Sequence, residues 1–186
     1  MKENHQYIVL LRGINVGGKN RVPMAELRDL LSKHGFEDVR TYIQSGNVLL
    51  SSVLEPTSIK QQIETLLIEN FKLDSALIKA LVLTDTQFRS VIANKPAGFG
   101  DQPEKYHSDV IFLMNIPVEE ALKVFKPREG VDSIWPGIGV IYSQRLSTER
   151  TKSRLNKIVG TPAYQSMTIR NWNTTLALQT LATKVV

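Results

Sequence analysis

The order in which apolar segments follow one another is the feature that most constrains how this chain can fold. In the first half, short apolar runs of strand length alternate with segments whose apolar residues recur at helical spacing. Pro23 suits a first helical position, and Gly46 lies in a Gln-Ser-Gly-Asn turn typical of a hairpin. The pattern predicts strand, helix, strand, strand, helix and strand at residues 7–11, 23–34, 39–43, 48–50, 58–67 and 76–83. This βαββαβ order is that of a ferredoxin-like unit.

The second half repeats this order in a weaker form. YIVLLRGIN aligns with DVIFLMNIP, and Pro23 and Gly35 correspond to Pro117 and Gly130. We therefore predict an α+β protein of two βαββαβ-type (ferredoxin-like) units related by a weak internal duplication, plus a C-terminal helix. The predicted domains are residues 1–94, a Gly- and Pro-rich linker at 95–107, and residues 108–186. The second unit is expected to end with a basic helix at 150–158, a strand at 167–170 and a helix from about Asn173 to Val186.

The segment GINVGGKN at residues 13–20 differs by one residue from a phosphate-binding P-loop, which has serine or threonine where Asn20 stands. In a P-loop the helix begins at the Gly-Lys-Ser/Thr itself, so that its amino end faces the phosphates. Here Pro23 predicts a helix that begins about three residues later, and the next strand arrives within a hairpin. The segment is therefore not predicted to be a working P-loop.

The same segment is predicted to lie beside the hairpin turn that follows the second strand. Strands one and two of a βαββαβ sheet run in the same direction, so the connections that follow them lie at the same end. Backbone amides, side-chain amides, a hydroxyl and basic groups would gather there, which suits a phosphate, a carboxylate or a base edge. The candidate ligand-binding residues are Arg12, Gly13, Asn15, Gly17, Gly18, Lys19, Asn20, Gln44, Ser45, Gly46 and Asn47. The alternative is that the glycines permit tight turns and the polar side chains tie the loops together.

Positive charge is concentrated near the end of the chain. The protein has a net charge of +5, and residues 143–172 alone carry six cations and the single acid Glu149. Such a cluster favours an anionic partner, although a solvated basic face is the plainer explanation. Arg150, Arg154 and Lys157 would share one face of the predicted helix. The candidate phosphate or nucleic-acid contacts are Arg145, Arg150, Lys152, Arg154, Lys157, Arg170 and Asn171.

Several other kinds of chemistry are excluded or disfavoured. The sequence contains no cysteine, which excludes disulfides, thiolate nucleophiles and cysteine-ligated zinc. His5, His34 and His107 are far apart, so neither a metal site nor a cofactor is predicted. No residue stands out as a general base. Because no segment has the pattern of a signal peptide or the length of a bilayer span, a cytoplasmic protein without a membrane partner is expected.

Three blocks of the sequence resemble a bacterial family catalogued as domain of unknown function 1697. They are YIVLLRGINVGGKNRVPMAELRDLL, GFEDVRTYIQSGNVLL and, near the end, TIRNWNTTLALQTL. The resemblance spans nearly the whole chain and implies a two-unit α+β fold with ferredoxin-like halves. The matching positions include Arg12, Gly13, Gln44 and Asn47, with Arg170, Asn171 and Thr174 in the last block. It implies neither a reaction nor a ligand.

Three functions are compatible with these features. The leading hypothesis is binding of a phosphate-bearing ligand, most plausibly nucleic acid, through the basic segment and the Gly/Asn-rich loop. The alternative is an enzyme that acts on a small phosphorylated or carboxylated molecule, with Arg12 and Lys19 as anion clamps. A scaffold or assembly role is a third hypothesis, because the end of the chain is apolar. The sequence carries no signal for an oligomeric state.

Overall fold

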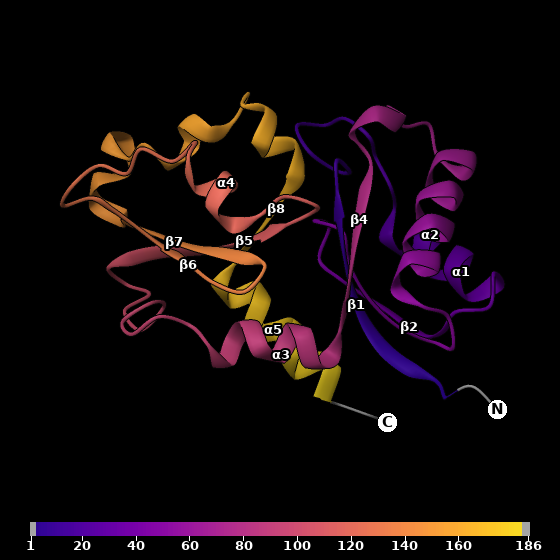
Figure 1. Cartoon of the computed structure of the whole chain (residues 1–186). Coiled ribbons are helices and arrows are strands. Elements are labelled where there is room, and N and C mark those ends of the chain that lie inside the picture. The colour runs from indigo at the N-terminus through magenta and orange to yellow at the C-terminus, as the bar shows by residue number, and fades with distance from the viewer. Residues whose placement is uncertain (1–2, 184–186) are drawn as a thin grey trace. The chain divides into compact units, whose positions relative to one another are not determined.

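The computed structural model describes residues 3–183 (Figure 1). Residues 1–2 and 184–186, which the predicted domains and the predicted C-terminal helix include, lie outside this range. The chain forms two compact units. Unit 1 contains the described residues up to Arg89 together with Leu178 to Thr183, and unit 2 contains Ser90–Ala177.

Each unit contains a four-stranded antiparallel sheet, with the strand orders β2-β3-β1-β4 and β6-β7-β5-β8. The predicted α+β class is therefore confirmed, together with the C-terminal helix. That the units arose by duplication, and that a linker at 95–107 separates two domains, stay predictions.

Unit 1 follows the predicted order of elements. They are β1 (His5–Arg12), α1 (Met24–Lys33), β2 (Glu37–Tyr42), β3 (Asn47–Ser52), α2 (Pro56–Asn70), a short 3-10 turn (Ser75–Leu77) and β4 (Lys79–Thr84). Side chains alternate along β1, so Tyr7, Val9 and Leu11 share one face of the sheet. On that face they form a single core with apolar residues of both helices: Leu27, Leu31, Ile59, Ile63 and Leu67.

Unit 2 keeps the strand order of unit 1 but has little α-helix beside its sheet. Its elements are the end of α3 (Asp85–Ala93), then β5 (Tyr106–Leu113), α4 (Val118–Leu122), β6 (Asp132–Pro136), β7 (Val140–Leu146), β8 (Met167–Asn171) and the start of α5 (Trp172–Thr183). Three 3-10 segments fill the connection between β7 and β8, at Ser147–Lys152, Leu155–Ile158 and Pro162–Ser166. Leu155 and Ile158 pack with Ile111, Ile141 and Phe125 in the core of this unit.

The basic helix expected at 150–158 is wrong. The first 3-10 segment ends at Lys152, and Ser153 has extended backbone angles, with φ −60° and ψ 142°. Arg154 then donates its backbone N–H to Oδ2 of Asp132 at 2.8 Å. A continuous α-helix would need that N–H for a carbonyl four residues earlier. The carboxylate therefore takes the hydrogen bond that would continue the helix.

The segment between α3 and β5 is anchored in unit 2 by an aromatic side chain. Phe99 is fully buried, and its ring lies edge-on to Trp135, Tyr142 and Trp172, with centroids 5.1 to 6.1 Å away. Next to it, Gly100 donates its N–H to the side chain of Gln144 at 3.0 Å. These contacts fix the position of Gly100 beside β5 and α5.

Candidate functional site

The structure brings together the two polar segments that the sequence places side by side in unit 1. Leu11 at the end of β1 donates its N–H to the carbonyl of Gly46 at 2.8 Å. Nδ2 of Asn15 donates to the carbonyls of Gln44 and Val22, at 2.9 Å each, and Oδ1 of Asn15 accepts from the Val22 N–H at 2.8 Å. One asparagine side chain therefore joins the loop, the hairpin turn and the approach to α1.

The other asparagines of this cluster are used in the same way. Nδ2 of Asn20 donates to the carbonyl of Gly13 at 2.8 Å, and its Oδ1 accepts from the Asp74 N–H at 2.9 Å. Asn47 is fully buried, and its Nδ2 donates to the Tyr42 carbonyl and to Oγ of Ser45. The amides that were candidates for a ligand therefore hold the loops in place.

Two glycines of the cluster are required by close packing. A Cβ atom on Gly13, whose φ is +88°, would lie 2.2 Å from the carbonyl oxygen of Leu77. On Gly46, a Cβ would lie 2.9 Å from Cβ of Leu11. Gly17 and Gly18 differ, because they form a tight turn between Val16 and Lys19 with open space around them.

The side chains that this cluster exposes are few. Lys19, Gln44 and Ser45 are exposed, whereas Arg12 is half-buried and has an interaction partner within the structure. That the cluster binds a ligand stays a prediction.

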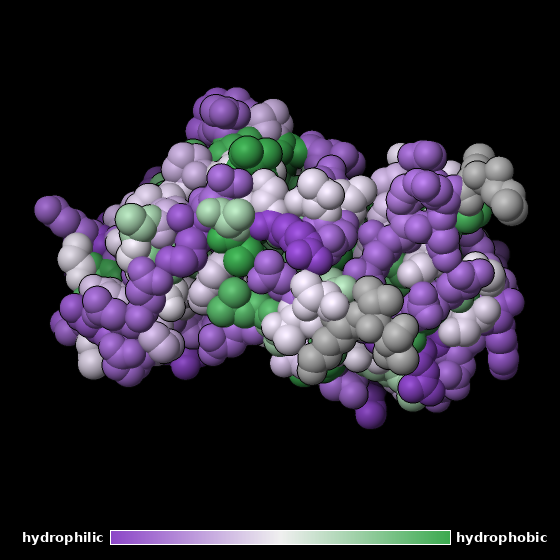
Figure 2. All heavy atoms as spheres, turned by 90° about the horizontal axis from the view of Figure 1, so that it is seen from below, coloured by the Kyte–Doolittle hydropathy of each residue, from purple (hydrophilic) through white to green (hydrophobic). Residues whose placement is uncertain are grey.

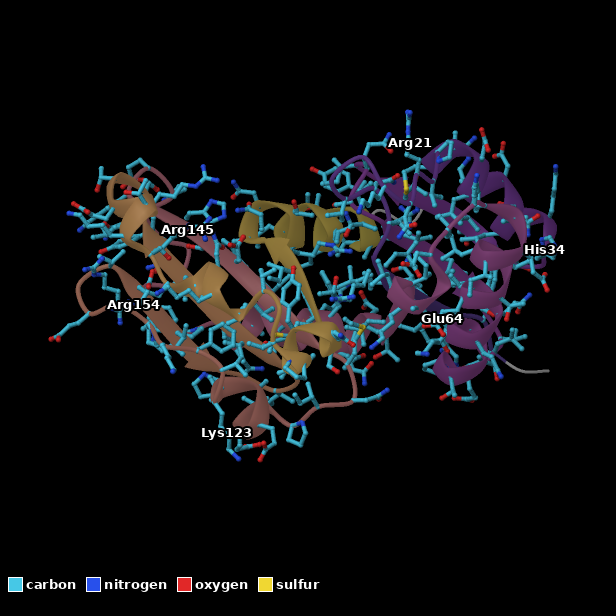
Figure 3. All side chains as sticks on the ribbon, turned by 90° about the horizontal axis from the view of Figure 1, so that it is seen from above. Arg21, His34, Glu64, Lys123, Arg145 and Arg154 are labelled. Atoms are coloured by element: carbon cyan, nitrogen blue, oxygen red, sulfur yellow. The ribbon has the colours of Figure 1, made fainter. Side chains whose placement is uncertain are left out.

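The basic candidates of unit 2 fall into a buried and an exposed group. Arg145 lies on the central strand β7 and Arg170 on β8, and both are more than 90% buried. Burial lowers the pKa of Arg170 to about 10, and its guanidinium donates to Oγ1 of Thr168 at 2.9 Å. Neither side chain lies free on the surface, and Figure 3 shows Arg145 over the strands of the sheet. The exposed group consists of Arg150, Lys152, Arg154 and Lys157.

A buried carboxylate holds this exposed group beside a second basic loop. Oδ2 of Asp132 accepts the backbone N–H groups of Arg128 and Arg154, at 2.9 and 2.8 Å. The Arg128 guanidinium also donates to the carbonyl of Lys152 at 3.3 Å. The loop that contains Arg128 and the segment that contains Lys152 and Arg154 are thus joined on one side of the unit. The exposed cations of that loop, Lys126 and Arg128, therefore lie near the exposed group. We call Lys126, Arg128, Arg150, Lys152, Arg154 and Lys157 the basic surface.

Opposite charge neutralises only part of the basic surface. Nζ of Lys152 pairs with Glu149 at 2.6 Å, and Glu129 is an exposed acid next to Arg128. Arg154 lies at the periphery of the unit in Figure 3. The face drawn in Figure 2 is mainly hydrophilic, with apolar side chains in small separate groups.

Sequence reasoning missed a polar cluster at the start of β5. Nε2 of His107 lies 3.0 Å from Oδ2 of Asp109, whose side chain is only 16% exposed. Burial raises the pKa of Asp109, while the nearby His107 and Arg145 oppose that rise. Residues two apart on a strand share one face, so the spacing His-x-Asp could have signalled the pair. The segment was instead assigned to a linker that ends at His107.

Two kinds of site are absent from the described part of the chain. Residues 3–183 contain no group of three or more histidine, aspartate or glutamate side chains arranged to hold a metal ion. None of the helices formed by these residues combines the length and apolar character needed to cross a membrane.

Comparison with known proteins places the chain in a family. The family described as protein of unknown function DUF1697 matches residues 5–142, so the chain belongs to that family and the resemblance seen in its sequence is confirmed. Among curated proteins, none matches the chain. A solved structure of the conserved bacterial protein SP0830 from Streptococcus pneumoniae is 26% identical, with a TM-score of 0.82. The similarity covers 96% of this chain and 99% of that one.

Proposed function

We propose that this member of the DUF1697 family binds nucleic acid through the basic surface of unit 2. The observation that supports the proposal is the link made by Asp132, which holds two basic loops together while their long side chains stay in solvent. The link keeps the cations of both loops together, as contact with neighbouring phosphates requires. The buried Arg145 and Arg170 are not part of the proposed contact set.

The chemistry of the basic surface favours contacts with phosphates over contacts with bases. Arginine and lysine side chains neutralise phosphates and release counterions, which gives affinity that falls steeply with salt and discriminates little between sequences. Stacking on bases requires exposed aromatic rings. Tyr164, the aromatic residue of the β7–β8 connection, is only partly exposed and packs against the core of the unit. We therefore expect binding with little sequence preference.

Charge reversal tests this proposal directly. The variant R150E/R154E/K157E removes three unpaired cations, and its affinity for short RNA and DNA oligonucleotides is measured by fluorescence anisotropy between about 50 and 200 mM salt. We expect affinity to fall by about 100-fold at the lowest salt. The slope of log affinity against log salt should become shallower by about two to three, because each lost phosphate contact reduces it by roughly 0.7 to 0.9.

A matched control separates the basic surface from net charge. The variant R28E/K33E/K72E makes the same change in charge at exposed positions of unit 1. It is expected to keep most of the affinity, since long-range repulsion is screened beyond about 10 Å at 0.1 M salt. Equal losses in both triple variants, or no oligonucleotide binding by the original protein, would refute the proposal.

A further inference from the structure

A second candidate site, separate from the basic surface, lies where the pairing of β5 with β8 stops. The last register pair is Asp109 with Asn171, after which the chain turns into α5. The first residues of β5, Tyr106 to Ser108, therefore continue the pairing with β7 beyond the last register pair with β8, and the side chain of Asn171 donates to the Ser108 carbonyl at 3.2 Å. A hollow of about 90 Å³ occupies this position.

The walls of the hollow come from three segments of unit 2. They include Gly100, Tyr106, His107, Asn171, Trp172 and Asn173. Gly100 is needed there, because a Cβ atom on it would lie 2.4 Å from Nε1 of Trp172. A volume of about 90 Å³ holds several waters or one group of the size of a phosphate or carboxylate.

His107 is the residue lining the hollow whose side chain can carry a positive charge. Its Nε2 is held by Asp109, which leaves Nδ1 as the ring nitrogen that is open to a ligand. In the doubly protonated ring both nitrogens donate, so Nε2 can donate to Asp109 while Nδ1 donates to a ligand. The side chain of Asn171 also donates a hydrogen bond to Asp109 and so fixes the carboxylate behind the ring.

The charges around the hollow favour an anion as its occupant. None of the described residues that line it is acidic. Asp109 itself does not line the hollow. The positive charge of Arg145, the register partner of His107 on β7, acts on Asp109 and offsets its negative charge. Nε of Arg145 is buried without a hydrogen-bond partner. Across the sheet, the register partner of Arg145 on β6 is Asp132. Lys105 lies with its Nζ 5.1 Å from the centre of the Tyr106 ring.

We propose that this hollow binds a small oxyanion, a phosphate or a carboxylate group, through the protonated ring of His107. The amide of Asn173 and the hydroxyl of Tyr106 are further donors among the lining residues. The start of α5 is not counted as a donor, because Asn173 already gives its backbone N–H to Oδ1 of Asn171 at 3.0 Å. Asp109 acts as a positioning residue that holds the ring through Nε2.

The test uses the ring signals of the three histidines in NMR spectra of the full chain. Sulfate serves as a probe for a phosphate-like group and acetate for a carboxylate, each added at constant ionic strength against chloride. We expect the His107 signals to shift and saturate with at least one probe, while the exposed His5 and His34 of unit 1 serve as internal controls and do not shift. Binding should weaken as the pH rises, because Nδ1 can donate to an anion while Nε2 donates to Asp109 only in the doubly protonated ring.

The response to the two probes distinguishes the ligands. Saturation by sulfate alone assigns a phosphate-like group, and saturation by acetate alone assigns a carboxylate. Saturation by both supports a general oxyanion site. No shift, or equal shifts of all three histidines, would overturn the proposal.

Two variants test the role assigned to Asp109. D109N keeps an oxygen that can accept from Nε2 but removes the charge, and we expect the affinity for the probe to fall about fivefold. E104Q removes an exposed charge from the segment before β5 and should bind as the original protein does. Amide spectra confirm that both variants are folded. H107Q is a second variant that should abolish binding; because it lacks the His107 ring signals, its binding is followed by the amide shifts of the other residues that line the hollow. Unchanged affinity in D109N and H107Q would contradict the assignment.

Discussion

In unit 1, the side-chain amides of three asparagines, Asn15, Asn20 and Asn47, donate to carbonyl or hydroxyl oxygens of neighbouring loops. In unit 2, by contrast, the ring of His107 lines a hollow and has only one of its nitrogens bound to the protein. The glycine- and asparagine-rich segment is the more conspicuous in sequence, yet its polar groups stabilise turns. The start of β5 is inconspicuous, yet its pairing with β8 stops there, beside the hollow. A high density of polar residues in the sequence is therefore a poorer guide to a binding site than a position in the structure where hydrogen bonding between strands ends.

Gly13→Ala is expected to have the largest effect, because it places a Cβ atom 2.2 Å from a backbone oxygen at a φ of +88°. Neither the turn nor the segment before β4 can move without losing hydrogen bonds, so we expect a loss of about 3 kcal/mol or more in the free energy of unfolding. Urea denaturation measures it. Gly17→Ala is the matched control, since Gly17 has open space around it and only the strain of positive φ, about 1 kcal/mol, should apply.

Asn15→Ala tests whether the side-chain hydrogen bonds of the loop cluster serve to hold the fold together. The change removes three hydrogen bonds and leaves the backbone N–H of Val22 without its acceptor, so we expect a loss of about 2–3 kcal/mol. Gln44→Ala is the control, because that residue contributes only its carbonyl to the bond with Asn15; it should change stability by less than about 0.5 kcal/mol. If Asn15→Ala were as stable as the original protein, the loop would be free to serve a ligand.

The sequence predicted unit 1 better than unit 2 for a physical reason. In unit 1, β1 is a continuous apolar run and both helices carry apolar residues at helical spacing, so the pattern shows them. Topology alone then places the Gly13–Asn20 segment beside Gln44. In unit 2 the strand β7 begins with apolar residues but continues through the polar Ser143, Gln144 and Arg145 to Leu146. Arg145 is therefore buried within a central strand, although in sequence it appeared to begin a basic surface segment.

Contacts that join distant residues account for the remaining differences. The expected basic helix is interrupted because Asp132, more than twenty residues earlier, binds the N–H of Arg154. The pair of His107 and Asp109 was missed because β5 begins with four polar or aromatic residues, which lack the apolar pattern of a strand. A hydrogen bond from a distant loop that ends a helix does not change the apolar periodicity of the sequence. A strand end made of polar residues has no such periodicity either.

Asp132→Ala tests the link that joins the two loops of the basic surface. The change leaves the backbone N–H groups of Arg128 and Arg154 without their acceptor, and we expect a loss of about 2 kcal/mol in the free energy of unfolding. Removing an acid should strengthen oligonucleotide binding by electrostatics alone. We expect weaker binding instead, because the loops would no longer be held together. Asp29→Ala, at an exposed acid of unit 1, is the control for the charge change, and stronger binding by Asp132→Ala would show that the link does not organise the surface.

The smallest effect is expected from the ionisation of Asp109. Burial raises the pKa of this carboxyl in the folded protein above its value of 3.8 in the unfolded chain. The folded state therefore holds the proton more tightly, and the stability that protonation contributes is fully present below pH 3.8 and is lost as the pH rises through the folded pKa. Asp109→Asn does not titrate, so the free energy of unfolding of the original protein, relative to this variant, should fall as the pH rises above about 4 and then become constant. Parallel urea titrations of both proteins measure the difference. A relative stability that rises with pH would mean that the contacts with His107, Asn171 and Arg145 outweigh burial and hold Asp109 as a carboxylate. The polar groups at the start of β5 would then satisfy one another, as the loop side chains of unit 1 do.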